Sequence, residues 1–181
     1  MKTIAEIDSL EMKWVQSGLL QRRYTLLAEE DIVATLNWVG GKLPHAVGQA
    51  ATGMWIFRSS RVIYPRVSIK SAMDDTVEAN FEASLKGQGS LLLTNGLKFY
   101  WENSNFWANK WEFTNAEGER LVQFKPEQGL FKIGAQVILQ QDAFIYLKEL
   151  PLLVITGWYL LTSMSQEDSD LSGLAKAIRF K

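Results

Sequence analysis

The chain has 181 residues, of which 47% are hydrophobic and 22% are charged, with a formal net charge of −1 and no cysteine. This balance is typical of an ordinary folded protein, and the length suits a single domain of ~100–200 residues. A net charge of −1 argues against a nucleic-acid binder, which carries a basic excess, and the missing cysteines exclude disulfides and thiolate metal sites.

The N-terminal residues 1–14, MKTIAEIDSLEMKW, contain no apolar stretch of the kind found in a secretory signal peptide. We therefore expect a cytoplasmic protein. The residues that follow are dominated by strand patterns rather than by targeting signals.

Apolar and polar residues alternate with a period of two along much of the chain, which is the pattern of half-buried β-strands. The clearest case is residues 76–85, where Val77, Phe81 and Leu85 share one face and Glu78 and Glu82 share the other. Further alternating runs lie at 32–38, 63–70, 97–101 and 133–139.

Turn residues separate these runs. Asn95-Gly96 lies between LLLT and LKFYW, and Asn-Gly is the strongest short-range hairpin signal. Further breaks are predicted at 29–31, 40–41, 115–118 and 126–129. About a dozen short strands at a spacing of ~8–12 residues indicate a sandwich or a barrel, and the chain shows no strand–helix rhythm of a parallel sheet.

The segment from about residue 143 to 164 lacks this alternation, and residues 150–166 carry no charge. We predict a helix that is apolar all round, which must be buried on every side. The inside of a barrel provides such a place, and a barrel of about 12 strands is too wide to be filled by strand side chains alone. The expected fold of residues 1–165 is therefore mainly β, a closed antiparallel β-barrel around a central hydrophobic C-terminal α-helix.

A membrane span is the less favoured interpretation of this helix. A span needs about 20 predominantly apolar residues, whereas Pro151, Thr156 and Gly157 interrupt the run, and the charged residues Lys148 and Glu149 lie just before it. We expect no transmembrane span. Residues 166–181 form a polar linker and a short amphipathic tail, which either docks on the domain or makes a weak lipid or partner contact.

Two segments carry a resemblance to a known family: LLLTNGLKFYWENSNFWANKWEFTNAEGERLVQF at 91–124 and LPLLVITGWYLL at 150–161. They resemble the tubby-like C-terminal domain superfamily, which includes LURP-one-related proteins and phospholipid scramblases, and in particular its bacterial members without assigned function. The resemblance implies a closed barrel around a hydrophobic helix. Tubby members bind phosphoinositide headgroups through basic side chains outside the barrel, and scramblases are associated with membranes and calcium.

The resemblance implies a non-enzymatic binding module, cytoplasmic or peripheral at a membrane surface, that binds anionic phospholipid or a protein partner. Its candidate ligand-binding residues are the basic ones of FRSSRVIYPRVSIK: Arg58, Arg61, Arg66 and Lys70. Forked guanidinium groups bind phosphate well. The alternative is a solvated face in which these cations pair with nearby acids, the candidates being Asp74, Asp75, Glu78 and Glu82.

Motifs for enzyme chemistry are missing. His45 is the only histidine, so histidine metal clusters are excluded and any catalytic triad would depend on it. The pair Gly87 and Gly89 precedes a strand rather than the helix that a phosphate loop needs, and no acidic loop has calcium-site spacing. We expect no enzyme activity, no metal and no cofactor.

Two other functions remain open. A barrel with an empty interior would suit a carrier of a small apolar ligand, although the predicted helix would occupy that interior. A hydrolase would use a carboxylate pair such as Asp74 and Glu78. The aromatic stretch is interpreted as core, and it comprises Phe99, Trp101, Phe106, Trp107, Trp111 and Phe113.

Overall fold

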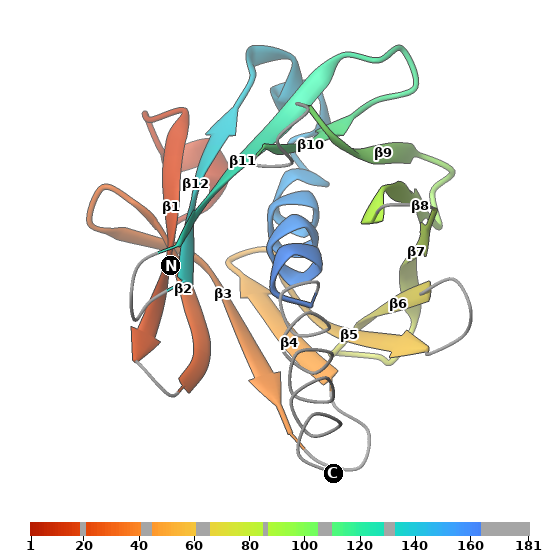
Figure 1. Ribbon diagram of the computed structural model, residues 1–181, viewed down its shortest axis with the longest axis horizontal. Helices are drawn as coiled ribbons and strands as arrows, with labels where there is room; N and C mark the ends of the chain where they lie inside the picture. Colours follow the sequence, from red (N-terminus) through yellow and green to blue (C-terminus); the bar gives the residue numbers. More distant parts are fainter. Residues whose placement is uncertain are drawn as a thin grey trace, which may run out of the picture.

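The computed structural model describes residues 1–18, 21–40, 45–60, 66–84, 87–104, 110–128 and 133–163. In these residues twelve strands form one closed antiparallel barrel, in which sequence neighbours pair and β1 pairs with β12 (Figure 1). The strands are β1 Glu11–Gly18, β2 Gln21–Ala28, β3 Asp31–Val39, β4 His45–Ala50, β5 Gly53–Ser60, β6 Arg66–Ser71, β7 Val77–Ala83, β8 Gly89–Leu93, β9 Lys98–Asn103, β10 Trp111–Thr114, β11 Arg120–Gln128 and β12 Ile133–Leu139. The predicted fold class is confirmed.

The alternating sequence explains which side of each strand faces the interior. On β7, Ala79 and Phe81 are buried, whereas Asn80 and Glu82 are exposed. The turn predictions at 29–31, 95–96 and 115–118 are confirmed, and Glu29, Gly96 and Gly118 have positive φ angles there. Positive φ suits glycine because it has no Cβ, which is why two of these three turns use it.

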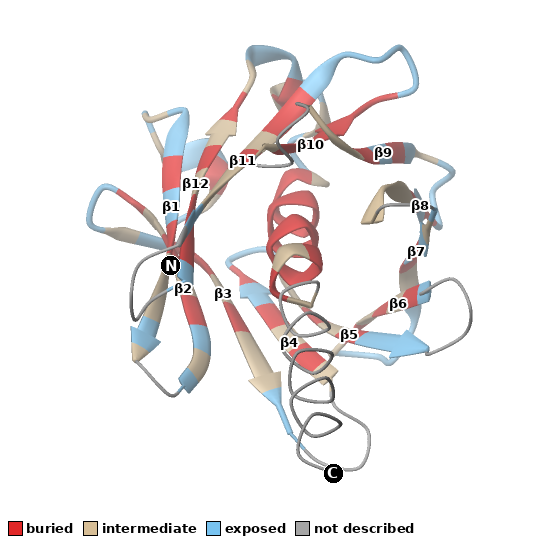
Figure 2. Cartoon of the chain, viewed as in Figure 1, coloured by how far each residue is buried: buried red, intermediate tan, exposed pale blue. Residues whose placement is uncertain are grey.

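A helix at residues 150–163, here called the central helix, lies inside the ring of strands (Figure 1). Every residue from 150 to 160 is buried, and Figure 2 shows the same along the visible ribbon. The predicted start at residue 143 is wrong, because the 3₁₀ helix η3 (Gln141–Tyr146) and a turn come first. Pro151 explains the later start, since proline fits the first helical turn, where its missing N–H has no partner to lose.

Two aromatic residues of the central helix anchor it to the barrel wall. Trp158 stacks on Trp14 of β1, with ring centroids 5.7 Å apart and an interplanar angle of 8°. Tyr159 lies between Trp38 of β3 and Phe57 of β5, with both centroid distances at 5.0 Å. Such pairs contribute ~0.5–1.5 kcal/mol each beyond the area they bury.

A cation extends the second stack. Arg22 lies on β2, next to β3, and its guanidinium carbon is 4.1 Å from the ring centroid of Trp38. The Trp38 indole N–H donates a hydrogen bond of 3.2 Å to the hydroxyl of Thr162 on the central helix. A guanidinium over the face of a tryptophan ring is attracted by the electrons of that ring.

Glycines let the central helix approach the wall closely. At Gly157 a Cβ would overlap the ring of Phe124 on β11. At Gly48 on β4 a Cβ would lie 2.5 Å from a methyl carbon of Ile155. The helix is therefore in direct contact with β11 and with β4 at these positions.

Strand β11 departs from the prediction of a break at 126–129. It continues through Pro126 to Gln128, and Pro126 lies opposite Ala135 of β12. On its other side, the pairing with β10 reaches only as far as Phe124. Pro126 therefore lies on a part of β11 that is paired on one side only, and proline is confined to such edge positions within sheets.

The aromatic residues interpreted as core are buried wherever the structure describes them. Phe99, Trp101, Trp111 and Phe113 are at most 5% exposed, and Trp101 stacks on Trp111 with centroids 5.3 Å apart. Residues 106 and 107 lie outside the described residues, as do Arg61 and the tail after residue 163.

Candidate functional site

The candidate site is the outer surface of five neighbouring strands, β2 to β6. Arg23, Asn37, Val47, Ile56 and Lys70 lie opposite one another in register, one on each strand. Neighbouring strands lie ~4.8 Å apart, so this row spans about 19 Å with a cation at each end. We call this surface the basic wall, and its outward residues are Arg23, Thr35, Asn37, Val47, Gln49, Met54, Ile56, Arg58, Arg66, Ser68 and Lys70.

The structure brings together three of the four predicted site residues. Arg58 on β5 lies opposite Ser68 on β6, and Ser68 stands between Arg66 and Lys70 on the same outward face. Diagonal neighbours of this kind are ~7–8 Å apart, so the three cations form a triangle. Arg61 lies outside the described residues.

Two of the three cations are already paired with acids, as the alternative interpretation predicted. Arg66 forms a 3.2 Å ion pair with Glu82, directly opposite on β7, and Lys70 forms a 3.0 Å ion pair with Asp75. In the first pair both side chains are more than half exposed. Exposed pairs of this kind contribute only ~0–1 kcal/mol, so either cation can exchange its partner at little cost.

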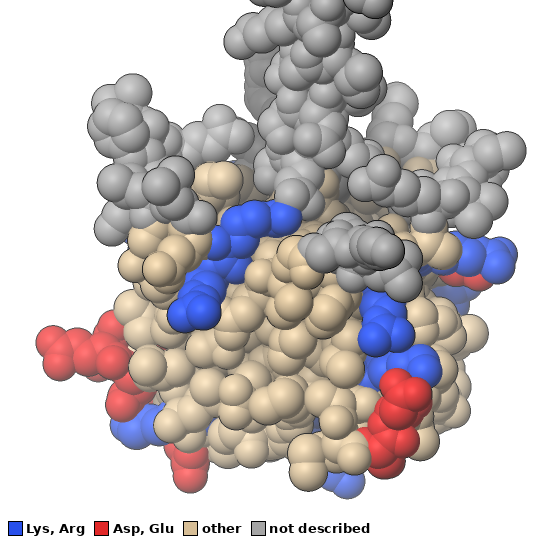
Figure 3. Space-filling model, turned by 90° about the horizontal axis from the view of Figure 1, so that it is seen from below, with Lys and Arg blue, Asp and Glu red and all other residues tan. Residues whose placement is uncertain are grey.

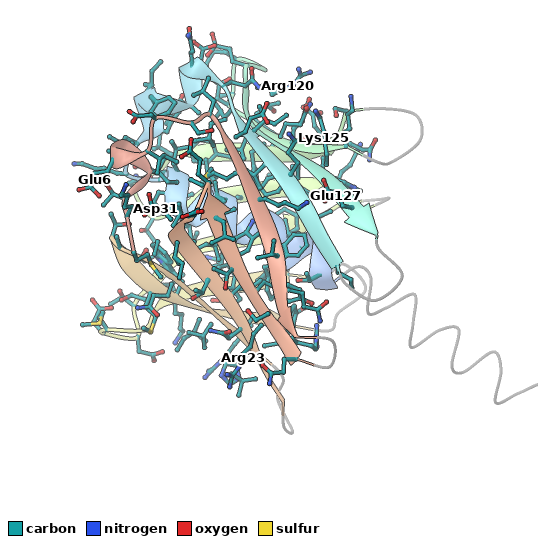
Figure 4. All side chains as sticks on the ribbon, turned by 90° about the vertical axis from the view of Figure 1, so that its left-hand side faces the viewer. Glu6, Arg23, Asp31, Arg120, Lys125 and Glu127 are labelled. Atoms are coloured by element: carbon teal, nitrogen blue, oxygen red, sulfur yellow. The ribbon has the colours of Figure 1, made fainter. Side chains whose placement is uncertain are left out.

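Arg58 makes no ion pair with any acid in the described part of the chain, and its side chain is exposed. The same is true of Arg23 on β2, within the residues that the structure describes. Figure 4 shows Arg23 at the opposite end of this side of the barrel from Glu6 and Asp31. The basic wall therefore has an unpaired arginine toward each margin.

Sequence reasoning missed Arg23. The alternation of Arg23 with the apolar residues Tyr24 and Leu26 could have predicted that its side chain faces outward. Its alignment with Lys70 could not be predicted, because that depends on the register of four successive strand pairs.

The middle of the basic wall carries no charge. The described outward residues between Arg23 and Arg58 carry no carboxylate, lysine or arginine. They are Thr35, Asn37 and Val39 on β3, the half-buried His45 with Val47 and Gln49 on β4, and Met54 and Ile56 on β5. Figure 3 views the side of the molecule on which β3, β4 and β5 lie in Figure 1 and shows basic groups on either side of a broad uncharged area. An anion reaching this area therefore meets no carboxylate from a described residue that would repel it.

The carboxylates considered for a hydrolase are engaged in separate contacts. Asp74 accepts hydrogen bonds from the Thr76 hydroxyl at 2.7 Å and the Thr76 N–H at 3.2 Å, and these hold the pKa of Asp74 below its usual value. Glu78 accepts a 2.6 Å hydrogen bond from the indole N–H of Trp55. Asp74 therefore orders a turn, and Glu78 anchors a tryptophan.

Within the described ranges, no group of three or more histidine or acidic side chains is arranged to hold a metal ion. No described helix is long and apolar enough to cross a membrane. His45 lies half-buried at the start of β4, opposite Val39.

Comparisons with protein-family models, with curated proteins and with solved structures gave no match for this chain. The relation to the tubby-like superfamily therefore remains a prediction from the segments 91–124 and 150–161. The function of the barrel has to be argued from its own surface.

Proposed function

We propose that this barrel is a non-enzymatic binding module whose basic wall binds the anionic headgroups of phospholipids at a membrane surface. The observation that carries the proposal is the pair of exposed arginines, Arg23 and Arg58, without acidic partners among the described residues and with only uncharged wall between them. The resemblance to tubby-like domains, which bind phosphoinositides on the outside of the barrel, supports the same ligand class.

The chemistry of the wall suits phosphate. A guanidinium presents parallel N–H donors that match two phosphate oxygens, and its charge is permanent. A basic residue near an anionic membrane contributes ~1 kcal/mol, so the two unpaired arginines supply ~2 kcal/mol. Arg66 and Lys70 add to this when they release Glu82 and Asp75.

The competing functions have less support. A carrier of a small apolar ligand needs interior space, and the central helix occupies that space, with every residue from 150 to 160 buried. A hydrolase needs two cooperating carboxylates, whereas Asp74 and Glu78 serve different hydrogen bonds. A protein partner with an acidic surface would use the same wall, and the test below separates it from lipid.

The test is co-sedimentation with vesicles of neutral phosphatidylcholine alone or mixed with an anionic phospholipid. The intact chain is expected to bind the anionic vesicles in preference, and salt is expected to weaken that binding. Arg58→Gln and Arg23→Gln should each reduce binding about fivefold, and the double variant about 30-fold. Lys125→Gln, which removes one positive charge on β11 (Figure 4), is the matched control and should have little effect.

Two results would contradict the lipid proposal. One is equal binding of the intact chain to neutral and anionic vesicles. The other is a double arginine variant that binds as the unmodified chain does. If the chain does not bind vesicles but binds an acidic protein in a way that depends on these arginines, the basic wall binds a protein partner instead of lipid.

A further inference from the structure

A crevice opens between the start of the central helix and the adjoining ends of β5, β7 and β8. It consists of two adjoining hollows of about 450 Å³ and 200 Å³, which share Trp55, Glu78 and Lys148 in their walls. We call it the mouth crevice. The larger hollow falls within the range of ~300–1,000 Å³ typical of small-ligand sites, and all of its lining residues are described.

The apolar part of the crevice is rigid. Trp55 is only 5% exposed, and its indole N–H is held by the 2.6 Å hydrogen bond to Glu78. Gly53 makes room for this ring, because a Cβ at that position would lie 2.9 Å from a ring carbon of Trp55. Buried Leu93 and Leu152 add apolar lining to the smaller hollow, and Met54 and Met73 add it to the larger one.

In the larger hollow the charged lining residues are Lys148 and Glu78, whereas Glu149 lines only the smaller hollow. Lys148 is exposed and forms no ion pair with any described residue, Glu78 included. Glu78 is half-buried, and its Oε2 atom is fixed by Trp55 while Oε1 accepts no hydrogen bond from the described residues. Glu149, also in the lining, accepts a hydrogen bond from Asn95 at 3.2 Å. Two unlike charges thus face one hollow without neutralising each other.

We propose that the mouth crevice binds a small zwitterion, an α-amino acid with an apolar side chain. The ammonium group would pair with the Glu78 carboxylate, the carboxylate with the Lys148 ammonium group, and the side chain would pack on Trp55. Such a ligand satisfies both charges at once, and charge-assisted hydrogen bonds are about twice as strong as neutral ones. This site is separate from the basic wall and does not depend on the function proposed for it.

The charge pattern predicts a strict selectivity. A ligand with an amine alone leaves Lys148 unpaired, and a ligand with a carboxylate alone leaves Glu78 unpaired in a half-buried site. A hydrogen bond to a charged group contributes ~1.5–3 kcal/mol, which corresponds to about 10-fold to 100-fold in affinity. Losing either charge of the ligand should cost about that much.

The experiment is isothermal titration calorimetry of the full chain with L-leucine, isoamylamine and 4-methylpentanoate. The last two have the leucine hydrocarbon skeleton and lack the carboxylate or the ammonium group, respectively. L-Leucine is expected to bind at least about tenfold more tightly than either. Absence of binding by L-leucine up to about 10 mM, a range that includes weak small-ligand sites, would overturn the proposal.

Variants locate the binding. Lys148→Met removes an exposed charge without disturbing the fold and should leave L-leucine no tighter than isoamylamine. Glu78→Gln should remove the preference for L-leucine over 4-methylpentanoate. Lys98→Met on β9, whose ammonium group lies over the Tyr100 ring, is the matched control and should bind as the unmodified chain does. Unchanged leucine affinity in Lys148→Met would contradict the assignment.

Discussion

The inner and outer faces of β5 and β6 are built by alternate residues of the same strands, yet they obey different constraints. Phe57 and Ile69 pair across the inner face and are fully buried against the core. Their outward neighbours Ile56 and Lys70 also pair, but both remain partly open to solvent. The inner face tolerates only what fits around the central helix, whereas the outer face is free to carry the charges of a binding surface.

The largest effect is expected where a charge enters the inner face. Trp158→Asp removes a ring stacked on Trp14, which costs ~3–5 kcal/mol, and buries a carboxylate, which costs several more. Because total stability is ~5–15 kcal/mol, we expect an insoluble or unfolded product. Ile145→Asp, at a 76% exposed position in η3, should remain soluble and cooperative in thermal denaturation. A folded Trp158→Asp protein would contradict the central position of the helix.

The next effect depends on pH. Burial raises the pKa of Tyr159 to about 12, against an ordinary value of 10.0. Its neutral form therefore contributes stability that is complete below pH 10 and is lost as pH rises toward about 12. The loss amounts to ~2–3 kcal/mol at most.

Urea unfolding at about pH 9 and about pH 11.5 measures this loss. Tyr159→Phe keeps the ring between Trp38 and Phe57 but cannot ionise. The free energy of unfolding of this variant should fall less with rising pH than that of the unmodified chain. Burial also raises the pKa of Tyr24, but Tyr24 is present in both proteins and lowers the stability of both equally. Parallel pH profiles would show that Tyr159 ionises freely.

A smaller loss is expected from crowding the contact between helix and wall. In Gly157→Ala the new Cβ overlaps the Phe124 ring, which costs ~1–3 kcal/mol, and the better helix propensity of alanine returns ~1 kcal/mol. The net loss in chemical denaturation should be ~0–2 kcal/mol. Gly40→Ala has open space around its Cβ and serves as the control. A stabilised Gly157→Ala protein would mean that the helix has room to shift.

The smallest change in stability is expected on the outer face, where a substitution should strengthen vesicle binding rather than weaken it. Glu82→Gln breaks the exposed ion pair with Arg66, which should change stability by less than ~1 kcal/mol. Freed from its partner, Arg66 should strengthen binding to anionic vesicles by up to about fivefold. Weaker vesicle binding by Glu82→Gln would place the lipid contact elsewhere than on the basic wall.

The inner face was predictable because burial imposes a period of two on strands such as 76–85 and an uncharged run on 150–166. Where a local signal competed with tertiary context, the prediction failed. Apolar character extends upstream of Pro151 and hid the true start of the helix. Pro126 predicted a break in the strand, but β11 continues through it, beyond the end of its pairing with β10 at Phe124.

The outer sites were only partly predictable. Arg58, Arg66 and Lys70 could be proposed from the sequence because they lie close together along the chain, whereas Arg23 joins them through register alone. Glu78 was interpreted as part of a solvated face from its alternation with Glu82. Its contact with Trp55 bridges 23 sequence positions, and the strand pattern gives no indication of it.

The seam between β1 and β12 has a consequence for how this chain reaches its native state. Met12 lies opposite Val137, 125 positions later, and the central helix follows only after that seam. Contacts between such distant residues slow folding, because the entropy of a long loop is lost before the contacts form. During synthesis Trp14, Trp38 and Phe57 lack their partners Trp158 and Tyr159 until the central helix has left the ribosome. A nascent chain stalled before that point should therefore be a chaperone client, and release of the central helix should end that dependence.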